Sequence, residues 1–196
     1  MSPRSAKQLD DIRKQKKELI METALELFAE NGFHATSVSQ IAKKAGISKG
    51  LAYNYFESKN DILNELIQHG FDAVYSNLDL NNDGIVTKDE FIQFIRHSFN
   101  LVRENTQHWK LYFSLMLQPH VANTFTEEYK SKGEPFFMMM YNFIKSNGSK
   151  DPEGDLMVVS AMLEGAFLYS IIAPDIFPID VMEEKVINAF FKIINN

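Results

Sequence analysis

Apolar residues recur at helical spacing along almost the whole chain of 196 residues. The first clear stripe runs from Leu19 to Phe28 and stops at Asn31 and Gly32, a pair that commonly ends a helix. Runs that alternate between apolar and polar residues, as a half-buried strand requires, are nearly absent. The sequence therefore predicts an all-α protein of about nine helices.

Capping residues and helix breakers place the other helices. Residues 1 to about 14 are expected to form a basic, frayed arm, and Pro135 is expected to separate two helices. Ser58 opens a longer helix that carries apolar residues as far as Leu78. Beyond it we expect helices near residues 88–105, 108–117, 122–131, 135–147, 155–173 and 180–195.

Two short segments with helix caps flank a tight turn. Ser37 and Gln40 have the spacing of a capping box, and Ser48 caps a third helix. The turn between them, Ala45–Ser48, contains Gly46, which tolerates a positive φ. Two short helices joined by such a turn can place the second one in the major groove of DNA. The same spacing also fits an ordinary helical corner, so the pattern alone leaves both interpretations open.

The second short helix carries side chains suited to DNA. Lys49 can reach a phosphate or a guanine, and Asn54 can pair with adenine. Gly50 allows the backbone to approach closely. The hydroxyls of Tyr53 and Tyr55 suit phosphate oxygens, as do Ser37 and Lys59, although both tyrosines also fit a core.

Charge and composition narrow the classes of protein. The net charge of −6 divides into +3 for residues 1–60 and −9 for the rest, so a basic head precedes an acidic body. The absence of Cys excludes disulfides and thiolate metal sites. No apolar run long enough for a membrane and no secretory signal are expected, which favours a cytoplasmic protein. No set of nucleophile, base and orienting group indicates an enzyme.

A series of landmarks lies in order between Ala24 and Leu63: Phe28, Gly32-Phe33, Thr36-Ser37-Val38, Ile41-Ala42, Ala45-Gly46, Tyr53, Tyr55-Phe56 and Lys59. This segment resembles the N-terminal domain of the TetR family of bacterial regulators. The resemblance implies a three-helix DNA-binding head, a linking helix, and a helical body that binds an effector and dimerises.

By position, the family's usual DNA contacts fall on ten residues: Ser37, Ser39, Gln40, Ser48, Lys49, Gly50, Tyr53, Asn54, Tyr55 and Lys59. Many relatives carry Arg or Thr where Ser39 and Gly50 stand here, so phosphate contacts transfer more safely than base contacts.

The resemblance divides the chain into an arm with the helix-turn-helix domain (residues 1–60) and a ligand-binding and dimerisation domain (residues 61–196). We expect a homodimeric transcriptional regulator that binds double-stranded operator DNA. It is expected to be a repressor released by a small apolar or amphipathic effector, with no required cofactor and no membrane partner.

The body is rich in Met and aromatic residues, which suit a deformable apolar cavity but also fill ordinary helical cores. The expected cavity residues are Phe94, Phe99, Trp109, Tyr112, Phe113, Met116, Phe137, Met140 and Tyr141. His97, His108 and His120 are further candidates to face it. The apolar run in 155–173 is expected to form the dimer interface, with Glu164-Gly165 letting two subunits approach.

Residues 79–90 fit the twelve-residue EF-hand calcium loop. Its expected oxygen ligands come from Asp79, Asn81, Asp83, Ile85, Thr87 and Glu90, and Gly84 stands at the sharp turn. The alternative is an ordinary turn in which Thr87 and Glu90 form a capping box. The loop also supports a different function, a calcium-binding sensor whose DNA binding is lost or secondary.

Overall fold

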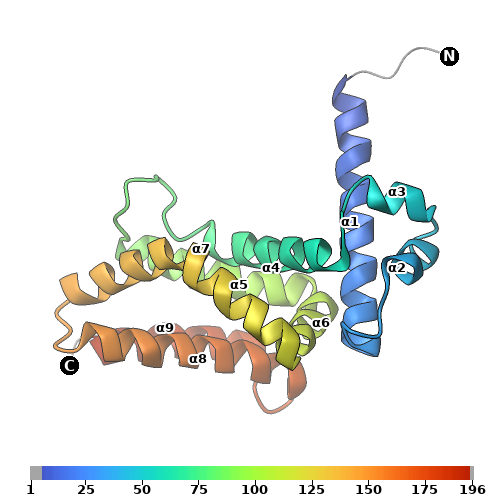
Figure 1. Cartoon of the computed structure of the whole chain (residues 1–196). Coiled ribbons are helices and arrows are strands. Elements are labelled where there is room, and N and C mark those ends of the chain that lie inside the picture. The colour runs from blue at the N-terminus through green and yellow to red at the C-terminus, as the bar shows by residue number, and fades with distance from the viewer. Residues whose placement is uncertain (1–5, 195–196) are drawn as a thin grey trace. The chain divides into compact units, whose positions relative to one another are not determined.

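The computed structural model describes residues 6–194, and all the regular structure in this range is α-helical (Figure 1). The all-α prediction is therefore confirmed. The nine helices within the described range are α1 (Ala6–Asn31), α2 (Val38–Lys44), α3 (Lys49–Tyr53), α4 (Lys59–Tyr75), α5 (Lys88–Glu104), α6 (Thr106–Met116), α7 (Pro119–Ser146), α8 (Pro152–Ile172) and α9 (Ile179–Ile194).

Helix α1 begins earlier than the sequence pattern predicted. Residues 6–14, expected to be part of a frayed arm, form its first turns, whereas residues 1–5 lie outside the described residues. Asp10 and Lys14 form an i,i+4 ion pair of 3.3 Å on this segment. The segment also consists largely of good helix formers, so local propensity favours the helix even without an apolar stripe.

Helix α7 is continuous where two helices were predicted. Pro135 lies inside it and is exposed. A proline removes only one hydrogen bond of the helical ladder, although its ring also strains the preceding turn. Met140, Phe143 and Ile144 are buried beyond it, and their packing holds the second half of the helix in line.

The chain forms two compact units. The first comprises residues up to His69 together with Ser114–Phe125, and the second comprises Gly70–Phe113 and the residues from Thr126 onward. This differs from the division expected at residue 60. The first turns of α4 belong with α1 because Ile62 and Leu66 are buried there, and Lys17 pairs with Glu65 at 2.8 Å.

Aromatic packing forms the core of the second unit. The Phe190 ring of α9 stacks on Phe91 of α5, with centroids 3.9 Å apart, and lies parallel to Phe143 of α7. Arg103 of α5 pairs with Asp180 and Glu183 at the start of α9. Helices α8 and α9 run side by side within this unit (Figure 1).

Helix α8 is long and apolar enough, by length and composition alone, to cross a membrane, with a mean hydropathy of 1.6 over its most apolar window. This corrects the expectation that the chain contains no such run. The helix buries Val159, Ala166, Phe167 and Ile171 within the second unit. Only 28% of the window is buried, so much of its apolar surface is left uncovered.

Candidate nucleic-acid interface

The start of α2 is fixed by its own side chains. The Gln40 backbone N–H donates to Ser37 Oγ at 3.3 Å, and the Ser37 backbone N–H donates to Gln40 Oε1 at 2.8 Å. These two bonds confirm the predicted capping box and satisfy backbone donors that a helix start leaves open. Ser39 and Gln40 are exposed on the first turn.

The turn after α2 has the conformation that its sequence predicts. Gly46 adopts a φ of +65°, which an L residue with a side chain adopts only with strain. The Ile47 backbone N–H donates to the Ala42 carbonyl at 3.0 Å, which closes the turn. Ile41 and Ala42 are buried beneath it. The turn therefore sets the direction in which α3 begins.

Helix α3 presents an open outer face. Ser48 caps it by accepting a hydrogen bond from the Leu51 backbone N–H at 3.1 Å, and Ala52 faces the core. On the other side Lys49 and Tyr53 are exposed, with Lys49 Nζ 5.8 Å from the Tyr53 ring centroid. A Cβ at Gly50 would meet nothing within 4 Å. This face can therefore receive a large partner without rearrangement.

The remaining predicted contact residues lie at or just beyond the two ends of α3. Asn54 is exposed at the C-terminal cap, Tyr55 is half-buried, and Ser48 is exposed at the start of the helix. Phe56 is buried and anchors the segment. The fold thus places all the predicted DNA-contact residues except Lys59 on capped, accessible turns of α2 and α3.

Lys59 is the exception, because its ammonium group is bound within the protein. Lys59 Nζ donates to the backbone carbonyls of Phe33 at 2.8 Å, His34 at 3.0 Å and Thr36 at 3.1 Å, and it lies 4.6 Å from the Phe33 ring centroid. An ammonium has three protons to donate, and all three are used. In this conformation Lys59 therefore stabilises the segment between α1 and α2 and is not a free phosphate ligand.

The two lysines at the end of α2 differ in their availability. Lys44 pairs with Glu26 at 3.0 Å and with Glu30 at 3.6 Å, and the Glu26 carboxylate raises its pKa. Lys43 is exposed, and no ion pair to it is found among the side chains that the structure describes. Lys43 is a candidate phosphate contact that the sequence analysis missed, and its position in the last turn of α2 was the available signal.

A distant segment also packs on the turn between α1 and α2. Gln118 Nε2 donates to the Phe28 carbonyl at 2.8 Å, and Gln118 Oε1 accepts from the Phe33 backbone N–H at 2.9 Å. The His120 ring stacks on Phe33 at 5.2 Å. His120 therefore belongs to the first unit, so the suggestion that it faces a cavity of the body is wrong.

Comparison with known proteins agrees with this geometry. The model of the family described as bacterial regulatory proteins, tetR family, matches residues 20–66, which cover the last turns of α1, all of α2 and α3 and the first turns of α4. The uncharacterized helix-turn-helix transcriptional regulator YuxN of Bacillus subtilis is 35% identical over 106 residues, which are 54% of this chain and 35% of YuxN. Residues 20–66 of the chain are therefore similar to the tetR family of bacterial regulatory proteins.

Solved structures extend the likeness from this segment to the fold of the chain. NalD of Pseudomonas aeruginosa, the secondary repressor of the MexAB-OprM efflux pump, has a TM-score of 0.72 at 18% identity, covering 92% of this chain and 97% of NalD. FadR of Bacillus subtilis in complex with stearoyl-CoA also has a TM-score of 0.72, at 17% identity, covering 90% of this chain and 98% of FadR. The chain spans about a third or less of the length of the first curated relatives it matches.

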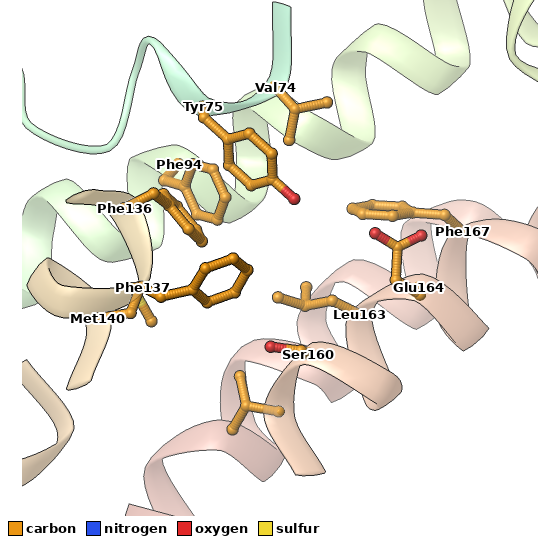
Figure 2. A pocket seen from close by; sticks show the side chains of 11 residues that line it. Val74, Tyr75, Phe94, Phe136, Phe137, Met140, Ser160, Leu163, Glu164 and Phe167 are labelled. Atoms are coloured by element: carbon orange, nitrogen blue, oxygen red, sulfur yellow. The ribbon is translucent and has the colours of Figure 1, made fainter. Parts of the chain in front are cut away.

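The second unit contains a pocket between α4, α5, α7 and α8 (Figure 2). It encloses about 480 Å³ of empty space, including its opening to solvent. Its lining is apolar and aromatic apart from Ser160, Glu164 and the Tyr75 hydroxyl. The lining residues are Val74, Tyr75, Phe94, Phe136, Phe137, Met140, Val159, Ser160, Leu163, Glu164 and Phe167.

Three of the nine predicted cavity residues line this pocket: Phe94, Phe137 and Met140. The other six do not line it. Phe99 is buried behind Phe167, their rings 4.8 Å apart, and Trp109 packs on Tyr112. Met116 lies in the first unit. Phe113 is half-buried elsewhere in the second unit, and Tyr141 lies beneath Lys145.

Two histidines suggested for the cavity are engaged elsewhere in the second unit. His97 Nε2 lies 3.1 Å from the Ala73 carbonyl, and the His108 ring stacks on Tyr112. Conversely, sequence reasoning missed Tyr75, Phe136 and Phe167 as lining residues. Aromatic content predicted a cavity in this region, but only the packing of the helices determines which rings face it.

The loop before α5 uses its oxygens for backbone contacts. Asp79 Oδ2 accepts from the Gly84 N–H at 2.8 Å, and Asp83 Oδ1 accepts from the Ile85 N–H at 2.8 Å. Glu90 is turned toward Thr87 and accepts from its N–H at 2.9 Å and from its hydroxyl at 2.7 Å.

The capping box at α5 is therefore present, as the alternative interpretation of the loop predicted. Glu90 also accepts from the Leu80 N–H, and Asn81 accepts from the Asp83 N–H. Within the described residues no three His, Asp or Glu side chains are gathered so as to hold a metal ion. Calcium binding by residues 79–90 stays a prediction.

Glu90 should make stability depend on pH. Hydrogen bonds from Thr87 hold the pKa of the buried Glu90 carboxyl below its ordinary value of 4.5. The unfolded chain then takes up a proton more readily, so this contribution is present above about pH 4.5 and is lost as the pH falls through the lowered pKa. We expect wild type to lose more unfolding free energy than Glu90→Gln between pH 6 and pH 3.5 in urea titrations.

The exposed Glu104→Gln variant is the control, and it should follow wild type. Equal acid sensitivity of wild type and Glu90→Gln would contradict the capping role. Calorimetric titration of Ca²⁺ into the same two proteins tests the calcium prediction, which requires heat of binding in wild type and none in Glu90→Gln.

Proposed function

We propose that this chain is a sequence-specific DNA-binding transcriptional regulator of the TetR family that acts as a repressor. The observation that carries the proposal is the open face of α3, capped at Ser48 and directed by the turn at Gly46. A short helix presented in this way fits the major groove, and the match to the family over residues 20–66 supports the same use. Such a regulator acts on the bacterial chromosome and therefore in the cytoplasm.

The accessible side chains divide between phosphates and bases. Lys49 and Asn54 are exposed at the two ends of α3 and are the proposed base contacts, while Gly50 lets the backbone approach the groove. The remaining predicted residues serve the phosphates through hydroxyls and helix starts. These phosphate contacts are Ser37, Ser39, Gln40, Ser48, Tyr53 and Tyr55, to which the structure adds Lys43. The test is whether the purified chain prefers a specific duplex to a shuffled one.

A ligand in the pocket is the proposed signal for release. Helix α4 begins in the first unit and supplies Val74 and Tyr75 to the pocket, while α7 also begins in the first unit and supplies Phe136 and Met140. A ligand that shifts either helix therefore acts on a rigid element that continues into the DNA-binding unit. The likeness to NalD, a repressor, and to FadR in complex with stearoyl-CoA supports this function.

We also propose that two copies associate through α8 and α9. Residues on the side of α8 away from its buried face follow helical spacing: Val158, Ala161, Gly165, Tyr169 and Ile172. Ile172 is 57% exposed, and nothing lies within 4 Å of a Cβ at Gly165. An apolar stripe with small residues at its centre suits a second copy of the same helix, and a two-fold dimer suits two half-sites.

Replacing Ile172 by Glu should convert the dimer to a monomer. The change places an unpaired charge on the apolar stripe of each subunit, where association would bury it. Light scattering coupled to size exclusion should give the mass of one chain for the variant and of two chains for wild type.

Leu117→Glu is the matched control because Leu117 is 75% exposed in the first unit. It should remain dimeric. A wild-type protein that is monomeric at micromolar concentration, or an Ile172→Glu variant that stays dimeric, would contradict the proposed interface.

A further inference from the structure

A single carboxylate lies in the aromatic pocket of the second unit. Glu164 projects from α8 toward rings contributed by α4, α5 and α7 (Figure 2). Glu164 is an exposed residue that lines the pocket, and partial desolvation by the surrounding protein raises the pKa of its carboxyl. The carboxyl group is thus accessible to a ligand, while the protein around it disfavours its charged form.

No positive group is found among the described residues that line the pocket. The lining contains no Lys, Arg or His, and no hydrogen bond or ion pair to Glu164 is found among the side chains that the structure describes. The groups that face it are Tyr75 from α4, Phe94 from α5, and Phe136, Phe137 and Met140 from α7. Tyr112 of α6 is the other titratable neighbour, and burial together with the Glu164 charge raises its pKa.

The walls of the pocket are suited to a cation. Aromatic faces carry negative electrostatic potential and attract a positive charge within about 6 Å of the ring centre, most strongly for cations that water solvates weakly. Tyr75 and Phe136 already lie with their centroids 4.1 Å apart, and Phe136 and Phe137 stand edge to face. The carboxylate adds the full counter-charge that the rings lack.

We propose that the pocket binds an apolar organic monocation, a quaternary or tertiary ammonium with an aromatic or aliphatic body, and that Glu164 is its counter-ion. Only the role of this ligand as the effector rests on the proposed function. The binding itself requires no DNA. The ligand's apolar body fills the space between Phe137, Leu163 and Phe167, and its charge lies between Glu164 and the Tyr75 ring.

This assignment links binding to protonation. A cation beside Glu164 favours the ionised carboxylate, so binding releases a proton whenever Glu164 is protonated in the free protein. The affinity for the cation should therefore rise with pH through the raised Glu164 pKa. Tyr75 and Tyr112 are phenols that stay neutral near pH 7 and do not contribute to this change.

The experiment compares benzyltrimethylammonium with its neutral carbon isostere, neopentylbenzene, on the full chain. Ligand-observed NMR and calorimetry measure both for wild type, Glu164→Gln and the exposed control Glu104→Gln. We expect wild type and Glu104→Gln to bind the cation at least about tenfold more tightly than Glu164→Gln does. The neutral isostere should bind all three alike, and thermal unfolding should show that all three are folded.

Equal affinity of wild type and Glu164→Gln for the cation would overturn the inference, as would no binding to wild type. A third contrary result is tighter binding of the anion phenylacetate than of the cation, which would mean that Glu164 acts as a protonated donor. Calorimetry in buffers of different ionisation enthalpy should show that wild type releases a proton when it binds the cation and that Glu164→Gln does not. A wild type that binds the cation but no specific DNA would contradict only the proposed function, and the reverse result would contradict only this inference.

Discussion

Replacing Lys49 by Glu should reduce the affinity for operator DNA by about 100-fold or more at 0.1 M salt. Lys49 is exposed at the first turn of α3, and its ammonium lies beside the Tyr53 ring. A contact of this kind contributes about 1–3 kcal/mol per half-site, and a two-fold dimer makes it twice. The reversed charge adds repulsion from the phosphates.

Fluorescence anisotropy with a labelled duplex measures this change. Lys110→Glu is the control because it changes the net charge by the same amount, while Lys110 is exposed on α6 in the second unit. The Lys110→Glu variant should keep nearly all of the wild-type affinity for DNA. The milder Lys49→Ala variant separates two roles, since loss of a phosphate contact lowers the salt slope by about one per Lys, whereas loss of a base contact relaxes the sequence preference. Wild-type affinity in Lys49→Glu would mean that α3 does not face the DNA.

Replacing Lys59 by Met should lower the free energy of unfolding of the first unit by about 2–3 kcal/mol. The change keeps the length of the side chain but removes the charged donor that three carbonyls share. Those carbonyls belong to the segment between α1 and α2, which precedes the capping box of Ser37. We therefore expect faster hydrogen exchange around residues 33–37 and a lower midpoint in urea.

Lys43→Met is the matched control, because Lys43 is exposed and no ion pair to it is found in the described part of the chain. It should unfold like wild type but bind DNA more weakly. The opposite pattern is also informative. A Lys59→Met protein as stable as wild type, with only its DNA affinity and salt slope reduced, would restore Lys59 to the phosphate contacts that the sequence predicted.

Local signals predicted the DNA-binding segment well. The capping box at Ser37, the cap at Ser48 and the turn at Gly46 depend on residues within four positions of one another, so the sequence is enough to place them. Pro135 shows the limit of such signals. A local helix breaker was overridden by the burial of Phe143 and Ile144 further along α7.

Contacts between distant residues were not predictable in this way. Lys59 bonds to carbonyls more than twenty positions away, and Gln118 reaches Phe28 across ninety. No spacing rule connects such residues. A polar side chain whose type suits DNA can be used inside the protein instead, as Lys59 is.

The same limit applies to the pocket. The composition of the body predicted an apolar cavity, and Phe94, Phe137 and Met140 of the expected residues line the pocket described above. Trp109 and Tyr112 have the same chemistry but face the core. Glu164 was expected near a subunit contact, yet it lines the pocket because its direction depends on how α8 is rotated about its axis.

The central claim, that α3 reads specific DNA, is tested most directly by the affinity of the wild-type chain for the DNA upstream of its own gene. Anisotropy at 0.15 M salt compares this duplex with a shuffled one of equal length and composition. The account predicts at least about a thousandfold preference for the natural sequence and protection of two symmetric half-sites about one helical turn apart. The natural duplex must cover the promoter. Equal affinity for this duplex and for the shuffled one would contradict the claim that α3 reads specific DNA.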